Sequence, residues 1–475
     1  MLIDRQGVEM TAAGQAVVDR YDRAVQELVH YGPAMLRLPE EAYVEDPSCP
    51  MVNALRAYFC LLTTEPCDVA DGRKLVEDFR RRVPDESLTG RERAHFRAVD
   101  ALLAGDFLGA ATVLRGLTRE CPRDALALYV GHNLDYFMGD ALALRDRVAE
   151  ALPAWSGADA LYGPMLGMHA FGLEECGDYE CSEEVGLRAL ELGSKDVWAI
   201  HAVVHTYEMQ ARFGDGVRFF EQRMGDWSDN NYFKVHNWWH YGLYNLEVGN
   251  LDTVLRVYDE RIFVEPALNV AVKMCDASAM LWRLLLDGID QAERWKPLAA
   301  VWEELIDEPC YAFNDMHAVM AFVGAGDVAR AEQLVADRER WLAQPHPGVT
   351  NFAMTARIGL PVCRAIVAFG RERYRDAVAQ LMPIRYNLNE FGGSHAQRDA
   401  VLRTLLEAAL RGGQLDLAER LVAERITVKP GSPYNWLKRS QVVRAEGDEV
   451  AAGEAEGHAI GLVRASGLDP VSAAA

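Results

Sequence analysis

The sequence predicts an all-α protein, a solenoid of tetratricopeptide-type helical hairpins. Apolar residues recur with helical spacing along nearly the whole chain, without alternating strand-like runs of useful length. A glycine followed by a polar residue recurs every 34 to 44 residues, which suits a left-handed helix end and a cap for the next helix. This period predicts a stack of roughly ten hairpins that can curl until it closes around a central cavity. The pattern occurs at Gly105-Asp106, Gly139-Asp140, Gly177-Asp178, Gly214-Asp215, Gly249-Asn250, Gly326-Asp327, Gly413-Gln414 and Gly447-Asp448, with looser versions near Gly288 and Gly370.

Three parts of the chain differ in regularity. Residues 1–100 predict an N-terminal helical cap, with helices over 19–35, 51–64 and 70–82 separated by proline-containing turns. Residues 101–465 predict the helical-repeat array, with a histidine-rich pocket at its centre. Residues 466–475 end in small side chains and predict a flexible tail.

Composition narrows the classes of partner and the location. A net charge of −22 over 475 residues argues against a surface that binds nucleic acid or an anionic membrane, because both need clustered Lys and Arg. Nine cysteines without Cys-x-x-Cys spacing predict reduced thiols. The N-terminus lacks the apolar core of a signal peptide, and we expect no apolar run long enough to span a bilayer. These features predict a cytoplasmic protein.

Two pairs of histidines stand out in the middle of the chain. His201 and His205 are four residues apart, as are His236 and His240, so each pair occupies one face of a helix. The two pairs are thirty-five residues apart, about one repeat, so they take equivalent places in successive hairpins. Stacked repeats bring equivalent positions together, so we expect the four imidazoles to converge, with Glu208 one turn beyond His205.

The repeat glycines extend this register. One offset, nine residues before the glycine, holds histidine in three repeats, and a second offset one turn earlier holds His201 and His236. Five of twelve histidines therefore occupy two register positions. Asp276, twelve residues before Gly288, falls near the same face. The histidines of the first offset are His205, His240 and His317.

Polar residues and tryptophans add further candidates. Ser394 and Gln397 have the spacing of a capping box, which would make them a helix start. Asp315 falls nearly opposite His317 on the helical wheel and predicts a cap for a helix beginning at Met316. Tryptophans in a helical stack are more often core than ligand contacts.

The runs WAIHAVVHTYEMQARFGDG, HNWWHYGLYNLEVGNLDTVLRVYDERI, CDASAMLWRLLLDG and GGSHAQRD resemble the tetratricopeptide repeat protein 38-like family. The resemblance extends from about residue 100 to residue 436 and implies a helical-repeat fold, without a named reaction. The pattern residues are His201, His205, Glu208, His236, Trp239, His240, Asp276, Trp282, Asp315, His317, Ser394, His395, Gln397, Arg398 and Asp399.

Three interpretations remain open at the level of sequence. The first is a metal site, because imidazoles and a nearby carboxylate bind divalent transition metals such as Zn, Fe, Mn or Ni. The second is a metal-free acid-base pocket, in which Arg398 holds an anionic group. The third is a non-catalytic tetratricopeptide scaffold that binds a peptide or protein in its groove.

We favour an enzyme of the hydrolase or lyase class whose partner is a small-molecule substrate. The proposed metal ligands are His201, His205, His236 and His240. The catalytic candidates are these four with Glu208, His317, His395 and Asp399, and the substrate-binding candidates are Trp239, Asp276, Trp282 and Arg398.

Overall fold

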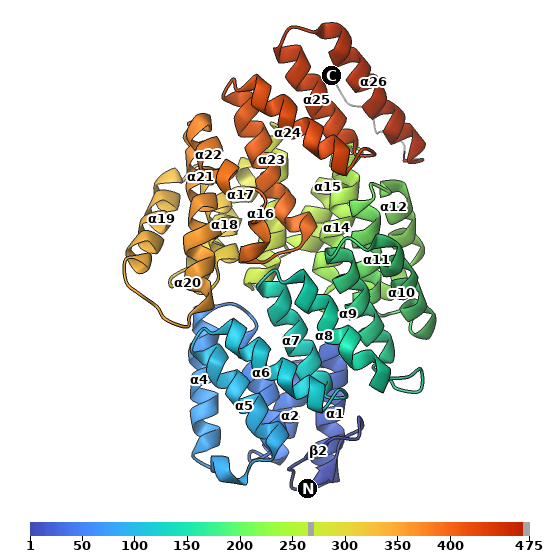
Figure 1. Ribbon diagram of the computed structural model, residues 1–475, viewed down its shortest axis with the longest axis vertical. Helices are drawn as coiled ribbons and strands as arrows, with labels where there is room; N and C mark the ends of the chain where they lie inside the picture. Colours follow the sequence, from blue (N-terminus) through green and yellow to red (C-terminus); the bar gives the residue numbers. More distant parts are fainter. Residues whose placement is uncertain (265–269, 469–475) are drawn as a thin grey trace.

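The computed structural model describes residues 1–264 and 270–468, and almost all regular structure within them is helical (Figure 1). The N-terminal elements are β1 Leu2–Ile3, β2 Glu9–Met10, α1 Gln15–Val29, α2 Arg37–Glu45, α3 Pro50–Leu61, α4 Pro66–Arg80, η1 Asp85–Ser87 and α5 Gly90–Leu103. The next are α6 Phe107–Glu120, α7 Ala125–Phe137, α8 Ala141–Ala151, η2 Leu152–Ala154, α9 Tyr162–Glu175, α10 Tyr179–Leu192, α11 Val197–Met209, α12 Phe213–Gln222, α13 Met224–Trp227, α14 Lys234–Glu247, α15 Leu251–Val257 and η3 Tyr258–Ile262. The last are α16 Ala271–Leu286, α17 Ala292–Leu305, α18 Ala312–Gly324, α19 Val328–Leu342, α20 Thr350–Met354, η4 Thr355–Gly359, α21 Leu360–Gly370, α22 Tyr374–Leu381, η5 Met382–Ile384, η6 Leu388–Phe391, α23 His395–Arg411, α24 Leu415–Val428, α25 Pro433–Ala445 and α26 Glu449–Ala465.

The repeat glycines end the first helix of most hairpins, as predicted. Eight of the ten predicted positions have a positive φ, the left-handed conformation that a side chain would strain. Gly214 lies inside α12 and Gly370 is the last residue of α21, and the left-handed places there are taken by Ala211 and Glu372 instead. A Cβ at Gly214 would meet the backbone oxygen of Ser466 at 2.0 Å, so glycine is needed there for close approach of the chain. The eight are Gly105, Gly139, Gly177, Gly249, Gly288, Gly326, Gly413 and Gly447.

The solenoid curls until distant repeats touch. The hydroxyl of Tyr311 donates to the backbone oxygen of Phe137 at 3.0 Å, and the amide of Thr350 donates to the oxygen of Gly105 at 2.9 Å. Helix α23 packs against both α16 and α11, although about 60 residues separate α11 from α16 in the sequence. Helices of the C-terminal half therefore contact helices of the N-terminal half directly.

The N-terminal helices also reach the centre. The amide of Tyr232 donates to the oxygen of Tyr31 at 2.7 Å, and the indole of Trp198 donates to the oxygen of Val29 at 3.0 Å. Two elements of this region were missed in the sequence, the two-residue hairpin β1–β2 and helix α2, which contains the predicted turn proline Pro39. Proline fits there because it lies in the first turn, where its missing amide costs no helical hydrogen bond.

Two further sequence predictions need correction, and a third is largely untested. Asp315 does not cap a helix, because α18 begins at Ala312 and the Asp315 carboxylate pairs with the buried guanidinium of Arg338 at 2.9 Å. The stretch 350–370 is apolar and long enough to cross a membrane, contrary to our expectation, although 67% of its window is buried in the protein as in a core helix. Of the predicted tail 466–475, residues 469–475 lie outside the described part of the chain.

Candidate metal centre

The four histidines of the paired motif converge between two neighbouring helices. His201 and His205 lie on α11, His236 and His240 lie on α14, and one nitrogen from each lies within 4.8 Å of the others. Three of the four side chains are fully or almost fully buried, and His236 is 18% exposed. The equal offset within each repeat therefore has the spatial effect that stacking predicts.

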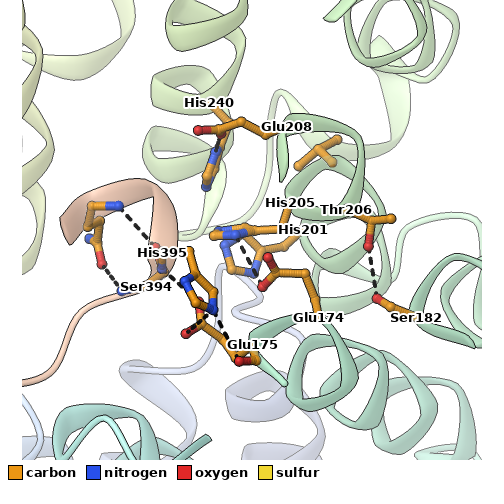
Figure 2. Close-up of polar contacts among 12 residues, drawn as sticks. Glu174, Glu175, Ser182, His201, His205, Thr206, Glu208, His240, Ser394 and His395 are labelled. Atoms are coloured by element: carbon orange, nitrogen blue, oxygen red, sulfur yellow. Dashed lines mark hydrogen bonds and ion pairs between the residues drawn. The ribbon is translucent and has the colours of Figure 1, made fainter. Parts of the chain in front are cut away.

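Carboxylates fix the orientation of the two α14 imidazoles. Nδ1 of His236 lies 2.9 and 3.0 Å from the two carboxylate oxygens of Asp276 on α16. Nδ1 of His240 lies 3.0 Å from Oε2 of Glu208 on α11 (Figure 2). A carboxylate accepts hydrogen bonds, so each Nδ1 carries the proton and each Nε2 keeps its lone pair. Carboxylate–histidine pairs of this kind orient the ligands of protein metal sites.

The free nitrogens of these rings point at one another. Nε2 of His236 lies 3.2 Å from Nε2 of His201 and 3.2 Å from Nε2 of His240. With the Nδ1 protons of His236 and His240 bonded to carboxylates, the lone pairs of the two Nε2 atoms face each other, and either a metal ion or a proton between them relieves the repulsion. Tetrahedral zinc with metal–nitrogen bonds of about 2.0–2.1 Å separates its ligand nitrogens by about 3.3 Å, close to the observed contacts.

Burial favours the neutral form of three of the four rings, those of His201, His205 and His240. It lowers the pKa of His205 to about 4, against a smaller opposing influence from Glu208 and Glu175. Burial, followed by the neighbouring imidazoles, holds the pKa of His201 and of His240 well below the ordinary value. A neutral imidazole is the form that binds a metal ion.

A cavity of about 490 Å³ reaches one side of the cluster. His201, His236 and Asp276 contribute to its lining, together with the otherwise buried His132, whose two nitrogens have no hydrogen-bond partner among the described residues. Leu36 and Val272 line it where the surface is exposed. Aromatic side chains supply much of the remaining wall, namely Tyr31, Tyr129, Phe171, Trp198 and Phe233.

A second group of acidic residues adjoins His205 and was missed in the sequence. Glu174 and Glu175 end α9, and Oε2 of Glu174 lies 3.5 Å from Nδ1 of His205. Burial, followed by the charge of Glu175, raises the pKa of Glu174 well above its ordinary value. Burial would raise the pKa of Glu175 too, but the guanidinium of Arg398 holds it below that value. No spacing rule relates α9 to the histidine pairs, so this contact requires the structure.

The residues that follow Gly393 form a helix start and contact this acidic pair. Ser394 and Gln397 make both bonds of the predicted capping box. Arg398 pairs with Glu175 at 3.0 Å, and the backbone amide of His395 donates to Glu175 at 2.9 Å. Arg398, which we expected to hold a substrate anion, is thus occupied by a carboxylate of the chain itself.

Several expected site residues lie away from the four-histidine cluster. His317 bonds through Nδ1 to the backbone oxygen of Phe313 at 2.8 Å, as a buried structural histidine does. Asp399 pairs with Arg403 at 2.6 Å and with Arg425 at 2.7 Å. The indole of Trp282 donates to the hydroxyl of Thr404 at 2.8 Å within the core.

Trp239 does belong to the surroundings of the cluster. Its ring stacks on that of His236 at 5.3 Å between centroids with an interplanar angle of 16°. The side chain is fully buried and is absent from the residues that line the cavity. Trp239 therefore supports the His236 ring from behind, and a ligand in the cavity would not touch it.

Solved structures with similar architecture are helical-repeat proteins. Human IFIT1, in a dimer with PPP-AAAA, matches with 11% identity over 96% of each chain and a TM-score of 0.41. The Cut9–Hcn1 hetero-tetramer of APC/C matches with 12% identity over 94% of this chain and 97% of that one, with a TM-score of 0.29. The tetratricopeptide domain of P58(IPK) matches with 11% identity over 80% and 99%, with a TM-score of 0.21. No family model matches the chain.

These structures correct our prediction about partners. We excluded nucleic acid on net charge and expected a small-molecule substrate, yet IFIT1 is described with an oligonucleotide and Cut9 with a protein partner. That prediction is therefore wrong as a rule for this architecture. The net charge of a whole chain does not determine the local charge of the residues that line a groove, so a net charge of −22 does not exclude a nucleic-acid partner.

Proposed function

We propose that this protein binds a divalent transition metal through His201, His205, His236 and His240. The contact between Nε2 of His236 and Nε2 of His240 at 3.2 Å is the observation on which the proposal depends. Both rings are held by carboxylates on their other nitrogen, so a shared cation explains the approach of two lone pairs. All-imidazole coordination suits zinc, iron and nickel better than magnesium or calcium.

The cavity supports a catalytic use of the metal. It reaches His201 and His236, so a coordination position on that side would be open to whatever enters from the exposed rim. A metal with an open position polarises a bound oxygen or lowers the pKa of a bound water. Hydrolase or lyase chemistry remains our hypothesis for the reaction, and the resemblance to the tetratricopeptide repeat protein 38-like family names no other.

Cobalt substitution tests this proposal. We would purify the full chain without a polyhistidine tag, remove metal with a chelator and add Co(II). The expected result is a visible d–d spectrum of tetrahedral or five-coordinate cobalt that shifts when azide is added, because azide takes an open position. A spectrum that does not change with azide would mean that protein ligands fill every coordination position, as in a structural site. If cobalt does not bind at all, the protein has no metal centre here.

A second candidate is a scaffold that binds another macromolecule. The helical-repeat architecture supports it, as do Leu36 and Val272, which line the cavity and remain 43% and 48% exposed. An apolar side chain of a partner could enter between them. Titration with PPP-AAAA, the oligonucleotide described with IFIT1, tests the nucleic-acid form of this candidate. Saturable binding that weakens with salt would support it.

A further inference from the structure

Beside the four-histidine cluster lies a second set of metal-binding groups. Glu174, Glu175 and His205 each offer one ligand atom, and these atoms lie within 4.8 Å of one another. Figure 2 places Glu174 beneath the His205 ring, on the side away from Glu208 and His240. All three side chains are buried, with Glu174 and His205 fully so.

Glu174 is unusual for a buried carboxyl group. Neither of its oxygens makes a hydrogen bond to any residue that the structure describes, and the same holds for both nitrogens of His205. Their closest approach is the 3.5 Å contact between Oε2 and Nδ1, which is too long for a good hydrogen bond. Leaving such groups unpaired in the interior destabilises the fold, so a ligand shared between them would stabilise the site.

The neighbouring carboxylate, Glu175, is fixed by two hydrogen bonds from the chain. The His395 amide donates to Oε1 at 2.9 Å, and the Arg398 guanidinium donates to Oε2 at 3.0 Å. These bonds fix the carboxylate and leave lone pairs on both oxygens, since each carboxylate oxygen can accept more than one bond. The arrangement resembles the outer partners that orient metal-ligating carboxylates.

His205 connects the two sets of residues. Its Nδ1 is the nitrogen near Glu174, while its ring lies 4.3 Å from those of His201 and His240 between centroids. We propose that Glu174, Glu175 and His205 form a second metal subsite. The His205 ring would bridge it to the four-histidine subsite as an imidazolate, its remaining N–H proton having been released to solvent when the second metal binds. The inference rests on the proposed function, because the first metal must be present to be bridged. Mixed oxygen and nitrogen donors suit Zn, Mn or Fe.

The competing explanation is a simple hydrogen bond. A small side-chain movement would let a protonated Glu174 donate to Nδ1 of His205, or a water molecule could join them. In that case the protein would hold one metal ion, and substitution of Glu174 would not alter the metal content.

Metal stoichiometry separates the two explanations. The tag-free full chain would be stripped, dialysed against Zn(II) and analysed by mass spectrometry, together with Glu174→Gln and, as a control, Glu180→Gln, which alters an exposed glutamate of α10. We expect about two ions per chain in the unaltered protein and the control, and about one in Glu174→Gln. One ion in all three would overturn the second subsite while keeping the proposed function, and none would overturn both.

A spectroscopic measurement on the unaltered protein tests the bridge directly, so the conclusion does not depend on whether the Glu174→Gln variant folds. With Cu(II) as the probe, an imidazolate bridge couples the two electron spins, so the unaltered protein should show a weakened, spin-coupled electron paramagnetic resonance signal. Glu174→Gln should restore a mononuclear signal of full intensity. Two uncoupled copper ions in the unaltered protein would overturn the bridging role of His205.

Discussion

Helices α11, α14 and α18 carry a histidine at the same position of the repeat. The histidines of α11 and α14 join the four-histidine cluster, whereas His317 on α18 does not. His205, His240 and His317 each lie nine residues before a repeat glycine. One turn earlier the first two helices carry His201 and His236, whereas α18 carries Phe313. His240 meets a carboxylate, while His317 bonds to the backbone oxygen of Phe313 in its own helix.

The difference shows what a buried histidine would need in order to bind a metal ion. Register brings rings to one face, but a metal site also needs a second imidazole one turn away and a carboxylate on the neighbouring helix. Asp276 and Glu208 supply that carboxylate for the pocket. His317 has neither: its Nδ1 bonds within its own helix, and its Nε2 has no hydrogen-bond partner among the described residues.

Removal of one cluster ligand should have the largest effect on this comparison. His236→Asn keeps a polar side chain but deletes the nitrogen that contacts both His201 and His240. We expect its zinc content to fall by roughly tenfold or more, while His317→Asn retains the metal. Equal loss in both variants would mean that the metal signal reports general stability.

The carboxylates should matter next. Asp276→Asn and Glu208→Gln replace the acceptors that hold the protons on Nδ1, so the rings lose a fixed tautomer. Zinc affinity measured by competition with a chelator should weaken about 10- to 100-fold. Asp140→Asn is the matched control, because Asp140 caps α8 and asparagine caps equally well. Unchanged affinity in the two cluster variants would contradict the orienting role.

Acid should reveal the buried neutral histidines of the metal-free protein. Burial lowers the pKa of His317 to about 4, below the value near 6.5 of the unfolded chain. The unfolded state therefore binds more protons as pH falls below about 6.5, so this histidine lowers the free energy of unfolding in that range. Between pH 7.5 and 5.5, the free energy of unfolding measured with urea should fall less steeply in His317→Gln than in the unaltered protein. The difference in slope should be up to about 1.4 kcal/mol per pH unit. An unchanged or steeper slope would contradict the assignment.

The smallest effect should come from the core tryptophan that resembles a site residue only in sequence. Thr404→Val removes the hydroxyl that accepts from the Trp282 indole. We expect a loss of about 1 kcal/mol in unfolding free energy, as for an unsatisfied buried donor, and no change in zinc affinity. A loss of zinc affinity in Thr404→Val would contradict the conclusion that Trp282 lies in the core and does not contribute to the metal site.

The sequence alone was sufficient for the fold class and for the convergence of the four histidines. Fixed helical periodicity relates His201 to His205, and the repeat length relates that pair to His236 and His240. Asp276 followed from the same register. The glycine pattern also predicted most hairpin ends, except where chain proximity at Gly214 demanded glycine for another reason.

The residues near the cluster that the sequence did not predict come from segments far apart in the chain, and no local spacing pattern relates those segments. Glu175 meets Arg398 across 223 positions, and the contact exists only because the solenoid closes. Tyr31 lines the cavity because the N-terminal helices fold into the array. Closure depends on the summed small rotations between repeats, and these are set by packing along the whole stack.

X-ray absorption spectroscopy of the zinc-loaded, tag-free chain tests the central claim most directly. Imidazole rings give outer-shell scattering that counts histidine ligands, and bonds of about 2.0–2.1 Å identify nitrogen or oxygen donors. Our account predicts at least three imidazoles around the metal, reduced in His236→Asn. A spectrum with one imidazole or none, or with sulfur ligands, would contradict it.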